Sequence, residues 1–280
     1  MKNIPQLDPA ALIKQYGLRA QKRLGQNFLQ DKFELEYIAA AAEIQASDSV
    51  LEIGPGLGSL TRYLSNYARE VVAVELDEKL DRILRIILKP YNNVRLIYGD
   101  ILKLSPNELG LPPNYIVAAN IPYNITSAII RHLLESESKP RRIVLTIQKE
   151  VAKRICESHP KMSLLALRVQ VYGRQTIKRV IPAEAFYPAP RVDSAVVEIE
   201  IYPKPMIFLP NLPVFFELIK AGFSQKRKTL RNALSAGLGI STSEIESLMI
   251  KANLDPKRRA ETLSLEEWGL LTSTRINLKI

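Results

Sequence analysis

Short apolar runs alternate with longer amphipathic stretches between residues 48 and 147. The runs are rich in valine and isoleucine and occupy residues 49–54, 70–75, 94–99, 115–120 and 142–147. Runs of this length and composition are typical of parallel strands that are buried on both faces. The stretches between them repeat apolar residues with the period of a helix that has one apolar face, at residues 59–68, 77–88 and 126–134. The alternation predicts a doubly wound α/β sheet.

The pattern changes in the second half of the chain. Residues 164–173 and 194–202 are predicted to be two further strands, of which the second is expected to add an antiparallel edge. Four prolines between residues 203 and 213 exclude a helix or a central strand there. The helical period returns at residues 214–239, 241–254 and 264–271. We therefore predict two domains, residues 1–205 and a smaller helical domain at residues 206–280.

The composition excludes several kinds of site. Cys156 is the single cysteine, so no disulfide forms within the chain, and with two histidines no metal cluster of Cys and His can be assembled. The first ten residues lack the apolar core of a signal peptide, and no stretch reaches the ~18 uninterrupted apolar residues of a membrane helix. We expect a folded, monomeric, cytoplasmic protein without a metal or a membrane partner.

The net charge of +10 is unevenly distributed. Residues 33–138 carry a net charge of −5, whereas residues 139–179 carry +9. This asymmetry favours one region that handles a small ligand and a neighbouring basic surface that contacts a polyanion, most commonly a nucleic acid. A basic surface that only keeps the protein in solution is the alternative.

A glycine-rich loop follows the first predicted strand, with Gly54, Gly56 and Gly58 before the next helix. Glycines at this place let the backbone approach a ligand closely and leave helix N-terminal amides pointing at an anion or a carboxylate. The spacing is G-x-G-x-G, whereas the dinucleotide fingerprint has a glycine or an alanine where this chain has Ser59. A nicotinamide dinucleotide is therefore less favoured but not excluded.

Acidic residues end the next two predicted strands. Glu75 lies where an acid commonly binds both hydroxyls of a ribose, and Asp100 ends the third strand in the same way. Each acid alone is equally consistent with a helix N-cap, but together with the glycine loop they favour an adenosine-containing ligand. The neighbouring residues Leu76 and Ile101 are included in this predicted site.

The identity of the ligand follows from the motifs that the chain lacks. It has no Walker A sequence and no plausible Ser-His-Asp set. S-adenosylmethionine fits the remaining features, with its amino-acid end on the glycine loop, its ribose on Glu75 and its adenine beside Asp100. Such a ligand site on a doubly wound sheet resembles the Rossmann-like class I S-adenosylmethionine-dependent methyltransferase domain, here expected with a smaller C-terminal helical domain.

The fourth predicted strand ends in Asn120, Ile121, Pro122 and Tyr123. An exocyclic aromatic amine is a poor nucleophile because its lone pair is delocalised into the ring. The Asn120 side-chain oxygen and a backbone carbonyl at Ile121 or Pro122 would hold the two amine hydrogens and orient the lone pair toward a methyl donor. Tyr123 offers a ring for base stacking, worth ~1–3 kcal/mol. A proline turn capped by Asn with a buried Tyr is the alternative.

Taken together, eight stretches resemble the adenine dimethyltransferases of small-subunit ribosomal RNA. They are "KRLGQNFL" (22–29), "LEIGPGLGSLT" (51–61), "VELD" (74–77), "GDIL" (99–102), "NIPYNITS" (120–127), "FYPAPRVDSAVV" (186–197), "FSQKRKTLRNAL" (223–234) and "RAETLSLEE" (259–267). Each stretch is modest alone, but eight in order are specific. The family often has Leu where this chain has Ile121, which leaves the backbone carbonyl in place.

The resemblance implies the roles of several residues. Asn27 and Leu29 are implied to close over the cofactor, which is also contacted by Gly54, Glu75, Asp100 and Asn120. Tyr123 and Phe186 are implied to sandwich an adenine that is flipped out of the RNA, although Phe186 taken by itself would more often be a core residue. The implied reaction adds two methyl groups to each of two adjacent adenosines in a terminal hairpin loop of small-subunit RNA.

Basic residues in three parts of the chain are predicted to bind phosphates of the RNA. One group lies near the N-terminus, a second in the strongly basic segment, and a third on a predicted helix of the C-terminal domain. The set is Lys22, Arg23, Arg141, Arg142, Lys149, Lys153, Arg154, Lys226, Arg227, Lys228 and Arg231. A solvated helix face is the alternative for the third group.

Two other functions remain open at this point. Large-subunit resistance methyltransferases share "QNFL" and "NIPY", so the distinction from them depends on "LGQ" before Asn27 and on "KRKTLRNAL" and "RAETLS". A non-catalytic ribosome-assembly or nucleic-acid-binding factor could keep the fold, but it would not need the glycine loop, Glu75, Asp100 and "NIPY" together. The assembling small ribosomal subunit is the expected partner.

Overall fold

The computed structural model describes residues 4–278, which form two compact units. The first unit runs to Ala152 and takes in Gln175–Ile201, and the second holds Lys153–Arg174 and the described residues from Tyr202 onward. The predicted boundary at residue 205 lies close to Ile201. Residues 153–174, however, group with the second unit and not with the first. The outermost residues of the two predicted domains, 1–3 and 279–280, lie outside the described residues.

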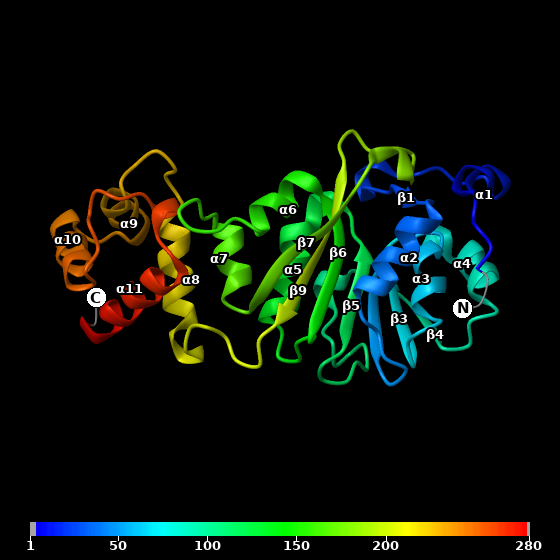
Figure 1. Cartoon of the computed structure of the whole chain (residues 1–280), viewed down its shortest axis with the longest axis horizontal. Coiled ribbons are helices and arrows are strands. Elements are labelled where there is room, and N and C mark those ends of the chain that lie inside the picture. Colours follow the sequence, from blue (N-terminus) through cyan, green and yellow to red (C-terminus); the bar gives the residue numbers. More distant parts are fainter. Residues whose placement is uncertain (1–3, 279–280) are drawn as a thin grey trace. The chain divides into compact units, whose positions relative to one another are not determined.

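A seven-stranded sheet in the order β4-β3-β2-β5-β6-β9-β7 is the framework of the first unit (Figure 1). Its strands are β2 (Ser49–Ile53), β3 (Glu70–Glu75), β4 (Val94–Tyr98), β5 (Ile116–Asn120), β6 (Arg142–Gln148), β7 (Gly173–Ile181) and β9 (Ser194–Ile201). The five predicted parallel strands are confirmed as β2 to β6. The predicted antiparallel strand is confirmed as β9, which pairs with β6, but β9 is not the edge of the sheet, because β7 lies beyond it. A separate small sheet pairs β1 (Phe28–Leu29) with β8 (Phe186–Tyr187).

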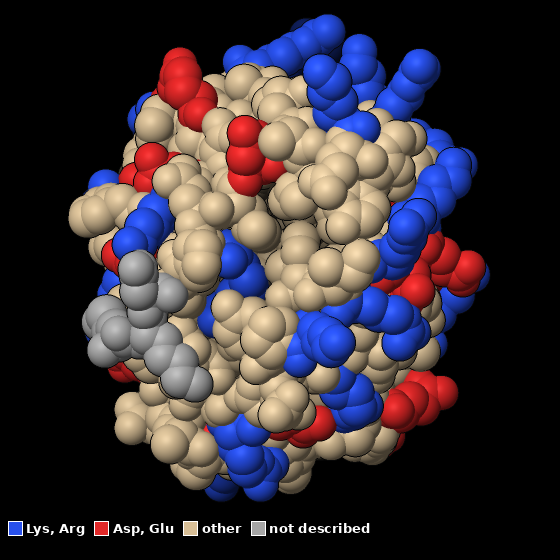
Figure 2. Space-filling view, turned by 90° about the vertical axis from the view of Figure 1, so that its right-hand side faces the viewer, with Lys and Arg blue, Asp and Glu red and all other residues tan. Residues whose placement is uncertain are grey.

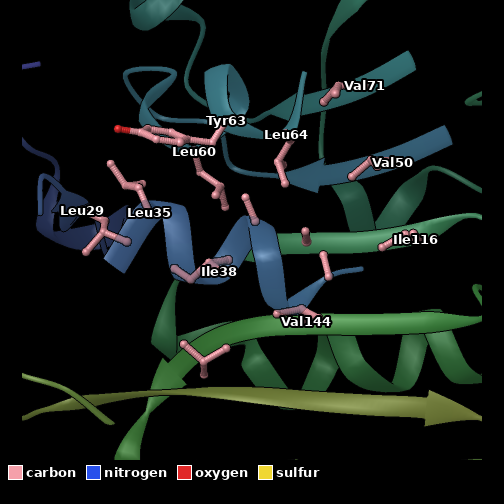
Figure 3. Packing of buried hydrophobic residues seen from close by; sticks show 14 of the residues in the cluster. Leu29, Leu35, Ile38, Val50, Leu60, Tyr63, Leu64, Val71, Ile116 and Val144 are labelled. Carbon is pink, nitrogen blue, oxygen red and sulfur yellow. The ribbon is translucent and has the colours of Figure 1, made fainter. Parts of the chain in front are cut away.

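The helices of the first unit are α1 (Pro9–Gln15), α2 (Lys32–Ala41), α3 (Ser59–Leu64), α4 (Asp81–Leu88) and α5 (Thr126–Glu135), and α6 (Lys149–Ile155) passes from the first unit into the second. Ile38 of α2 and Leu64 of α3 are fully buried and share one hydrophobic cluster with Val50, Ile116 and Val144 of the sheet (Figure 3). Helix α2 was not predicted from the sequence pattern.

The strand predicted at residues 164–173 is wrong, because Leu164–Gln170 form helix α7. Ser163 caps this helix by accepting the Ala166 N–H at 3.0 Å, and its leucines and alanine are strong helix formers. The strand follows as β7, in which exposed and more buried residues alternate. Such alternation is typical of a strand with one solvated face, so a search for apolar runs does not detect it.

The second unit is helical, with α8 (Leu212–Gly222), α9 (Leu230–Leu238), α10 (Thr242–Lys251) and α11 (Leu265–Leu278) besides α7. The helical stretch predicted at 214–239 is interrupted by a turn between α8 and α9. Lys226, Arg227 and Lys228 lie in this turn, so their predicted place on a helix is wrong. At the end of α8, a Cβ on Gly222 would lie 2.6 Å from the Trp268 ring, which shows how closely α8 and α11 pack.

The strand order reverses between β2 and β5. From β2 the chain proceeds outward through β3 and β4, then returns to the other side of β2 as β5. Because β2 pairs in parallel with both β3 and β5, the loops after β2 and β5 leave the sheet on the same side, at the carboxyl ends of the strands, and diverge from there. Open α/β sheets bind ligands in the crevice at such a reversal. The fold therefore points to the segments that follow Ile53 and Asn120.

The packing of α2 on the sheet leads to a stability prediction. Ile38→Ala removes a fully buried side chain and should lower the free energy of unfolding by about 2–5 kcal/mol, because it leaves a cavity between α2 and the strands. Urea unfolding followed by circular dichroism measures this. Ile86→Ala is the matched control, since Ile86 is 51% exposed and should cost less than about 1 kcal/mol. Equal losses in the two variants would contradict the assigned core.

Candidate active site

A pocket of about 310 Å³ lies at the carboxyl ends of β2, β3 and β5, within the first unit. Its size is at the lower end of the range for ligand pockets. Nearly all the predicted cofactor residues line it, namely Asn27, Leu29, Gly54, Gly56, Glu75, Leu76, Asp100, Ile101 and Asn120. The predicted catalytic residues Ile121, Pro122 and Tyr123 line the same pocket. Residues far apart in sequence are thus brought together as the sheet topology requires.

The glycine loop meets the pocket through two of its three glycines. A Cβ on Gly54, at φ +71°, would meet no atom within 4 Å and would project into open space. A Cβ on Gly56 would lie 3.0 Å from the Phe28 ring, so a side chain there would press on β1. Gly58 does not line the pocket, and a Cβ on Gly58 would lie 3.2 Å from the Leu88 side chain of α4. Gly58 therefore serves the start of α3 and its packing, and its predicted cofactor contact is not supported.

Glu75 is held rigidly at the end of β3. It is 6% exposed, and its two carboxylate oxygens accept the N–H groups of Gly56 at 3.0 Å and of Asp77 at 2.8 Å. Burial raises the pKa of Glu75, while the two N–H donors act against this shift. Each oxygen retains a further lone pair, so the carboxylate can accept two hydroxyl groups from a ligand.

Two residues beside Glu75 and Asp100 give the pocket an apolar part. Leu76 is 52% exposed, Ile101 is buried, and both line the pocket. Asp100 accepts the Leu102 N–H at 3.1 Å and so caps a short 3₁₀ helix. The arrangement suits a flat ring with a polar edge near Asp100.

Glu52 is a pocket residue that sequence reasoning missed. It lies on β2, is 1% exposed and lines the pocket, and its Oε2 atom has no hydrogen-bond partner among the described residues. Burial raises the pKa of Glu52 to about 8, and the nearby charge of Glu75 acts in the same direction. The Ser59 hydroxyl beside it on the lining also lacks a partner. A charged residue inside an otherwise apolar run was the available signal.

Asn120 is fixed in orientation at the end of β5. Its side-chain Nδ2 donates to the backbone carbonyl of Asn27 at 3.1 Å. This bond uses one of the two N–H donors and sets the orientation of the amide, so that Oδ1 is the side-chain atom that can accept from a ligand. Beyond it, the Pro122 carbonyl accepts the Ile125 N–H at 3.4 Å. The Ile121 carbonyl is therefore the better second acceptor of the two that were predicted.

The two predicted aromatic residues are placed differently. The Tyr123 hydroxyl is 2.6 Å from the Ser194 hydroxyl, which anchors the ring at the pocket. Phe186 is 2% exposed, pairs with Leu29 across the small sheet and belongs to the hydrophobic cluster under α2. It does not line the described pocket. The prediction that Phe186 forms one face of a stacking site is therefore not supported in this conformation.

The predicted basic residues fall into two groups. Arg141 pairs with Asp48 at 2.6 Å, and Arg142 pairs with Glu43 and Glu198 at 2.7 Å each. Both arginines lie at the amino end of β6, the edge of the sheet opposite to the pocket, so their predicted role in gripping phosphate is not supported. Lys149, at the other end of β6, pairs with Asp193 at 3.1 Å.

The remaining basic residues are more accessible. Lys22 and Arg23 are exposed, and Arg23 lines the pocket. Lys153 and Arg154 are exposed on α6, as is the turn at 226–228, and Arg231 pairs with Glu246 at 2.8 Å. The side of the first unit that carries α1 and α4 faces the viewer in Figure 2, where many Lys and Arg side chains lie along the upper and right-hand margins and acidic side chains are scattered.

Two kinds of site are not found within residues 4–278. No group of three or more His, Cys, Asp or Glu side chains is arranged to hold a metal ion. In the same part of the chain, no helix combines the length and the apolar character needed to cross a membrane.

Comparisons with known proteins agree with the pocket. Residues 17–271 match the family model described as ribosomal RNA adenine dimethylase. The chain is 49% identical over 261 residues to the ribosomal RNA small subunit methyltransferase A of Dehalococcoides mccartyi. The aligned region covers 93% of this chain and 90% of that protein.

Solved structures show the same likeness. A dimethyladenosine transferase from Plasmodium falciparum is similar with a TM-score of 0.77 and 25% identity, over 90% of this chain and 98% of that one. The 23S rRNA methyltransferase ErmE is similar with a TM-score of 0.71 and 26% identity, over 89% and 99% of the two chains. The observed fold is thus that of class I methyltransferases, as predicted.

The buried acid on β2 predicts a dependence of stability on pH. The pKa of Glu52 is raised from 4.5 to about 8 by folding, so its contribution to stability is full below the unfolded pKa and is lost as pH rises toward the folded one. The isosteric change Glu52→Gln should remove this loss. The difference in melting temperature between Glu52→Gln and the wild type should therefore grow from about pH 5 to pH 8.

The control for this measurement is Glu78→Gln, because Glu78 is exposed and the substitution is the same. Its melting temperature should follow the wild type at every pH. If Glu52→Gln also ran parallel to the wild type, Glu52 would not be a neutral buried carboxyl.

Proposed function

The chain belongs to the ribosomal RNA adenine dimethylase family, and from this premise we propose that it dimethylates two adjacent adenosines in the 3′-terminal hairpin loop of small-subunit ribosomal RNA. The methyl donor is S-adenosylmethionine. The observation that carries the proposal is one pocket in which a glycine loop and buried acids lie opposite Asn120 and Tyr123. The RNA is bound within the assembling small subunit, in the cytoplasm.

The pocket residues fit the proposed donor. The unpartnered Oε2 of Glu52 and the unpartnered hydroxyl of Ser59 can bind the ammonium group of its amino-acid end. Gly54 leaves space for that end, the Glu75 carboxylate accepts the ribose hydroxyls, and Leu76 with Ile101 flanks the adenine. When bound, the donor supplies an electrophilic methyl group on a positively charged sulfur.

The acceptor side of the pocket orients the amine. Asn120 Oδ1 accepts one amine hydrogen and the Ile121 carbonyl accepts the other, so that the nitrogen lone pair is turned out of conjugation and toward the methyl carbon. Tyr123 stacks on the base, and its bond to Ser194 holds the ring in place. The nitrogen loses its proton only once the new bond has made it acidic, so no strong base is required. Catalysis is mainly positioning.

The RNA contacts are proposed to extend beyond the pocket. We include Lys22, Arg23, Lys149, Lys153, Arg154, Lys226, Arg227, Lys228 and Arg231 in the proposed contact set. We leave out Arg141 and Arg142 because they lie at the amino end of β6, away from the pocket. The pocket is formed by the first unit of a single chain, so the enzyme is expected to act as a monomer. Phe186 is left out of the site because its ring belongs to the core.

The test of the function is methyl transfer to isolated subunits. Small subunits that lack the modification are incubated with the protein and labelled donor, and the RNA is digested and analysed by mass spectrometry for N6,N6-dimethyladenosine. Transfer to two adjacent adenosines of the small-subunit RNA is expected. Transfer only to large-subunit RNA would favour the alternative that ErmE represents, and binding without transfer would leave a non-catalytic assembly factor.

Replacement of the oriented amide should separate catalysis from binding. Asn120→Ala should lower the rate of methyl transfer about 100- to 1000-fold, the usual effect of removing one preorganised polar group, while the affinity for RNA stays the same. Single-turnover transfer at saturating donor measures the rate. Asn107→Ala is the control, because Asn107 is exposed outside the pocket. Near-normal turnover of Asn120→Ala would mean that other groups orient the amine.

Replacement of the basic turn should weaken RNA binding. The triple change Lys226→Ala, Arg227→Ala and Lys228→Ala removes three exposed cations, and it should flatten the dependence of log K on log salt by about 0.7–0.9 for each lost phosphate contact. The matched control removes three exposed lysines elsewhere, at Lys14, Lys89 and Lys251. An equal effect of both triples would show that only the net charge matters.

A further inference from the structure

One segment, residues 21–29, covers the pocket and is called the strap here. Its residues from Arg23 to Leu29 line the pocket. A Cβ on Gly25 would lie 3.2 Å from the Cβ of Pro122, so the strap approaches the acceptor side closely. Phe28 packs over Gly56 on the donor side. The strap thus touches both halves of the pocket, and its position depends on what holds it.

A single buried carboxylate holds the start of the strap. Asp77 is 7% exposed, and its Oδ2 atom accepts hydrogen bonds from Gln21 Nε2 at 2.5 Å and from Gln26 Nε2 at 2.8 Å. The Gln26 Oε1 atom accepts the Gln21 N–H at 2.8 Å, which fixes the orientation of the Gln26 amide. Both glutamine amides therefore present donors to one charged acceptor, the stronger kind of hydrogen bond.

The hydrogen bonds from Gln21 and Gln26 to Asp77 are called the latch here. The latch is connected to both the donor side and the acceptor side of the pocket. On one side, the Asp77 N–H donates to Glu75 Oε1 at 2.8 Å, so the latch and the proposed ribose acid share one backbone turn. On the other side, the Asn27 carbonyl, next to Gln26 in the chain, accepts Asn120 Nδ2 at 3.1 Å. That bond decides which atom of the Asn120 side-chain amide faces the adenine amine.

We propose that Asp77 is a positioning residue: through Gln21 and Gln26 it holds the strap where the Asn27 carbonyl keeps Asn120 Oδ1 directed at the adenine amine. The inference rests on the proposed function, and it assigns a role to Asp77 that neither donor binding nor base stacking requires. Without the latch, the Asn27 carbonyl moves away and the Asn120 amide is free to rotate. A misplacement of about 1 Å at such a group can lower the rate as much as 100-fold.

A purely local role for Asp77 makes a different prediction. Its other oxygen, Oδ1, accepts the Lys79 N–H at 3.3 Å and caps the short 3₁₀ helix Glu78–Leu80. The cap uses Oδ1 and the latch uses Oδ2. A variant that keeps Asp77 but removes a latch donor therefore tests the latch without disturbing the cap.

The test variant is Gln26→Glu, which has nearly the same shape. The new side chain keeps an oxygen that can accept the Gln21 N–H, but the amide donor to Asp77 is replaced by a second carboxylate oxygen. Repulsion between the two carboxylates at positions 26 and 77 should therefore release the strap. At saturating donor and small subunits, kcat should fall about 10- to 100-fold, with little change in melting temperature. Gln45→Glu, which makes the same change in charge at an exposed position outside the pocket, should retain the wild-type kcat.

Two further measurements distinguish positioning from general damage. The double variant Gln26→Glu with Asp77→Asn restores a hydrogen bond of reversed polarity and should recover most of the lost kcat. In the Asn120→Ala background, Gln26→Glu should cause no further loss, because the latch acts through Asn120. An unchanged kcat in Gln26→Glu, no recovery in the double variant, or a full additional loss in the Asn120→Ala background would each overturn the proposal.

Failure of the latch is distinguishable from failure of the proposed function. The wild-type protein is assayed in parallel in every experiment. If the wild type transfers no methyl group to small-subunit RNA, the proposed function fails. If the wild type transfers methyl groups while the latch variants behave like the wild type, only the role of Asp77 fails.

Discussion

Parallel pairing of β2 with both β3 and β5 is the constraint on which the site depends. It brings the carboxyl ends of three strands to one edge and leaves a crevice where the strand order reverses. The glycine loop follows β2, Glu75 ends β3 and Asn120 ends β5. The pairing of these strands alone therefore places the donor side next to the acceptor side. The same geometry explains why Arg141 and Arg142, at the amino end of β6, cannot belong to the site.

Buried charge is the second theme of the pocket. Glu52 and Glu75 are both removed from water, and burial raises the pKa of each. Glu75 is compensated by two backbone N–H groups, whereas Glu52 keeps an unpartnered oxygen. A ligand with a positively charged group can complete that arrangement, since an uncompensated buried carboxylate is costly. The pocket thus offers one carboxyl with an unpartnered oxygen, at Glu52, and one held by backbone N–H groups, at Glu75.

The acceptor side is controlled by contacts that cross long stretches of sequence. The Asn120 amide is oriented by the carbonyl of Asn27, and the strap that carries this carbonyl is held by Asp77. The donor site and the acceptor site thus share one hydrogen-bonded connection. The two units have different expected roles. The residues that line the pocket all belong to the first unit, whereas the second unit contains the exposed basic turn at residues 226–228, where part of the RNA contact is expected.

The sequence by itself determined the five parallel strands, the antiparallel strand β9 and most of the residues that line the pocket, because valine-rich runs, glycines and strand-end acids act locally. It failed where local signals conflict with tertiary context. Leu164–Gln170 are apolar enough for a strand, but they form a helix that Ser163 caps. The basic turn was not predicted because the residues around it repeat with a helical period. Only the tertiary structure decided that Phe186 belongs to the core, that Glu52 faces the pocket and that Asp77 holds the strap, because these roles depend on partners distant in the chain.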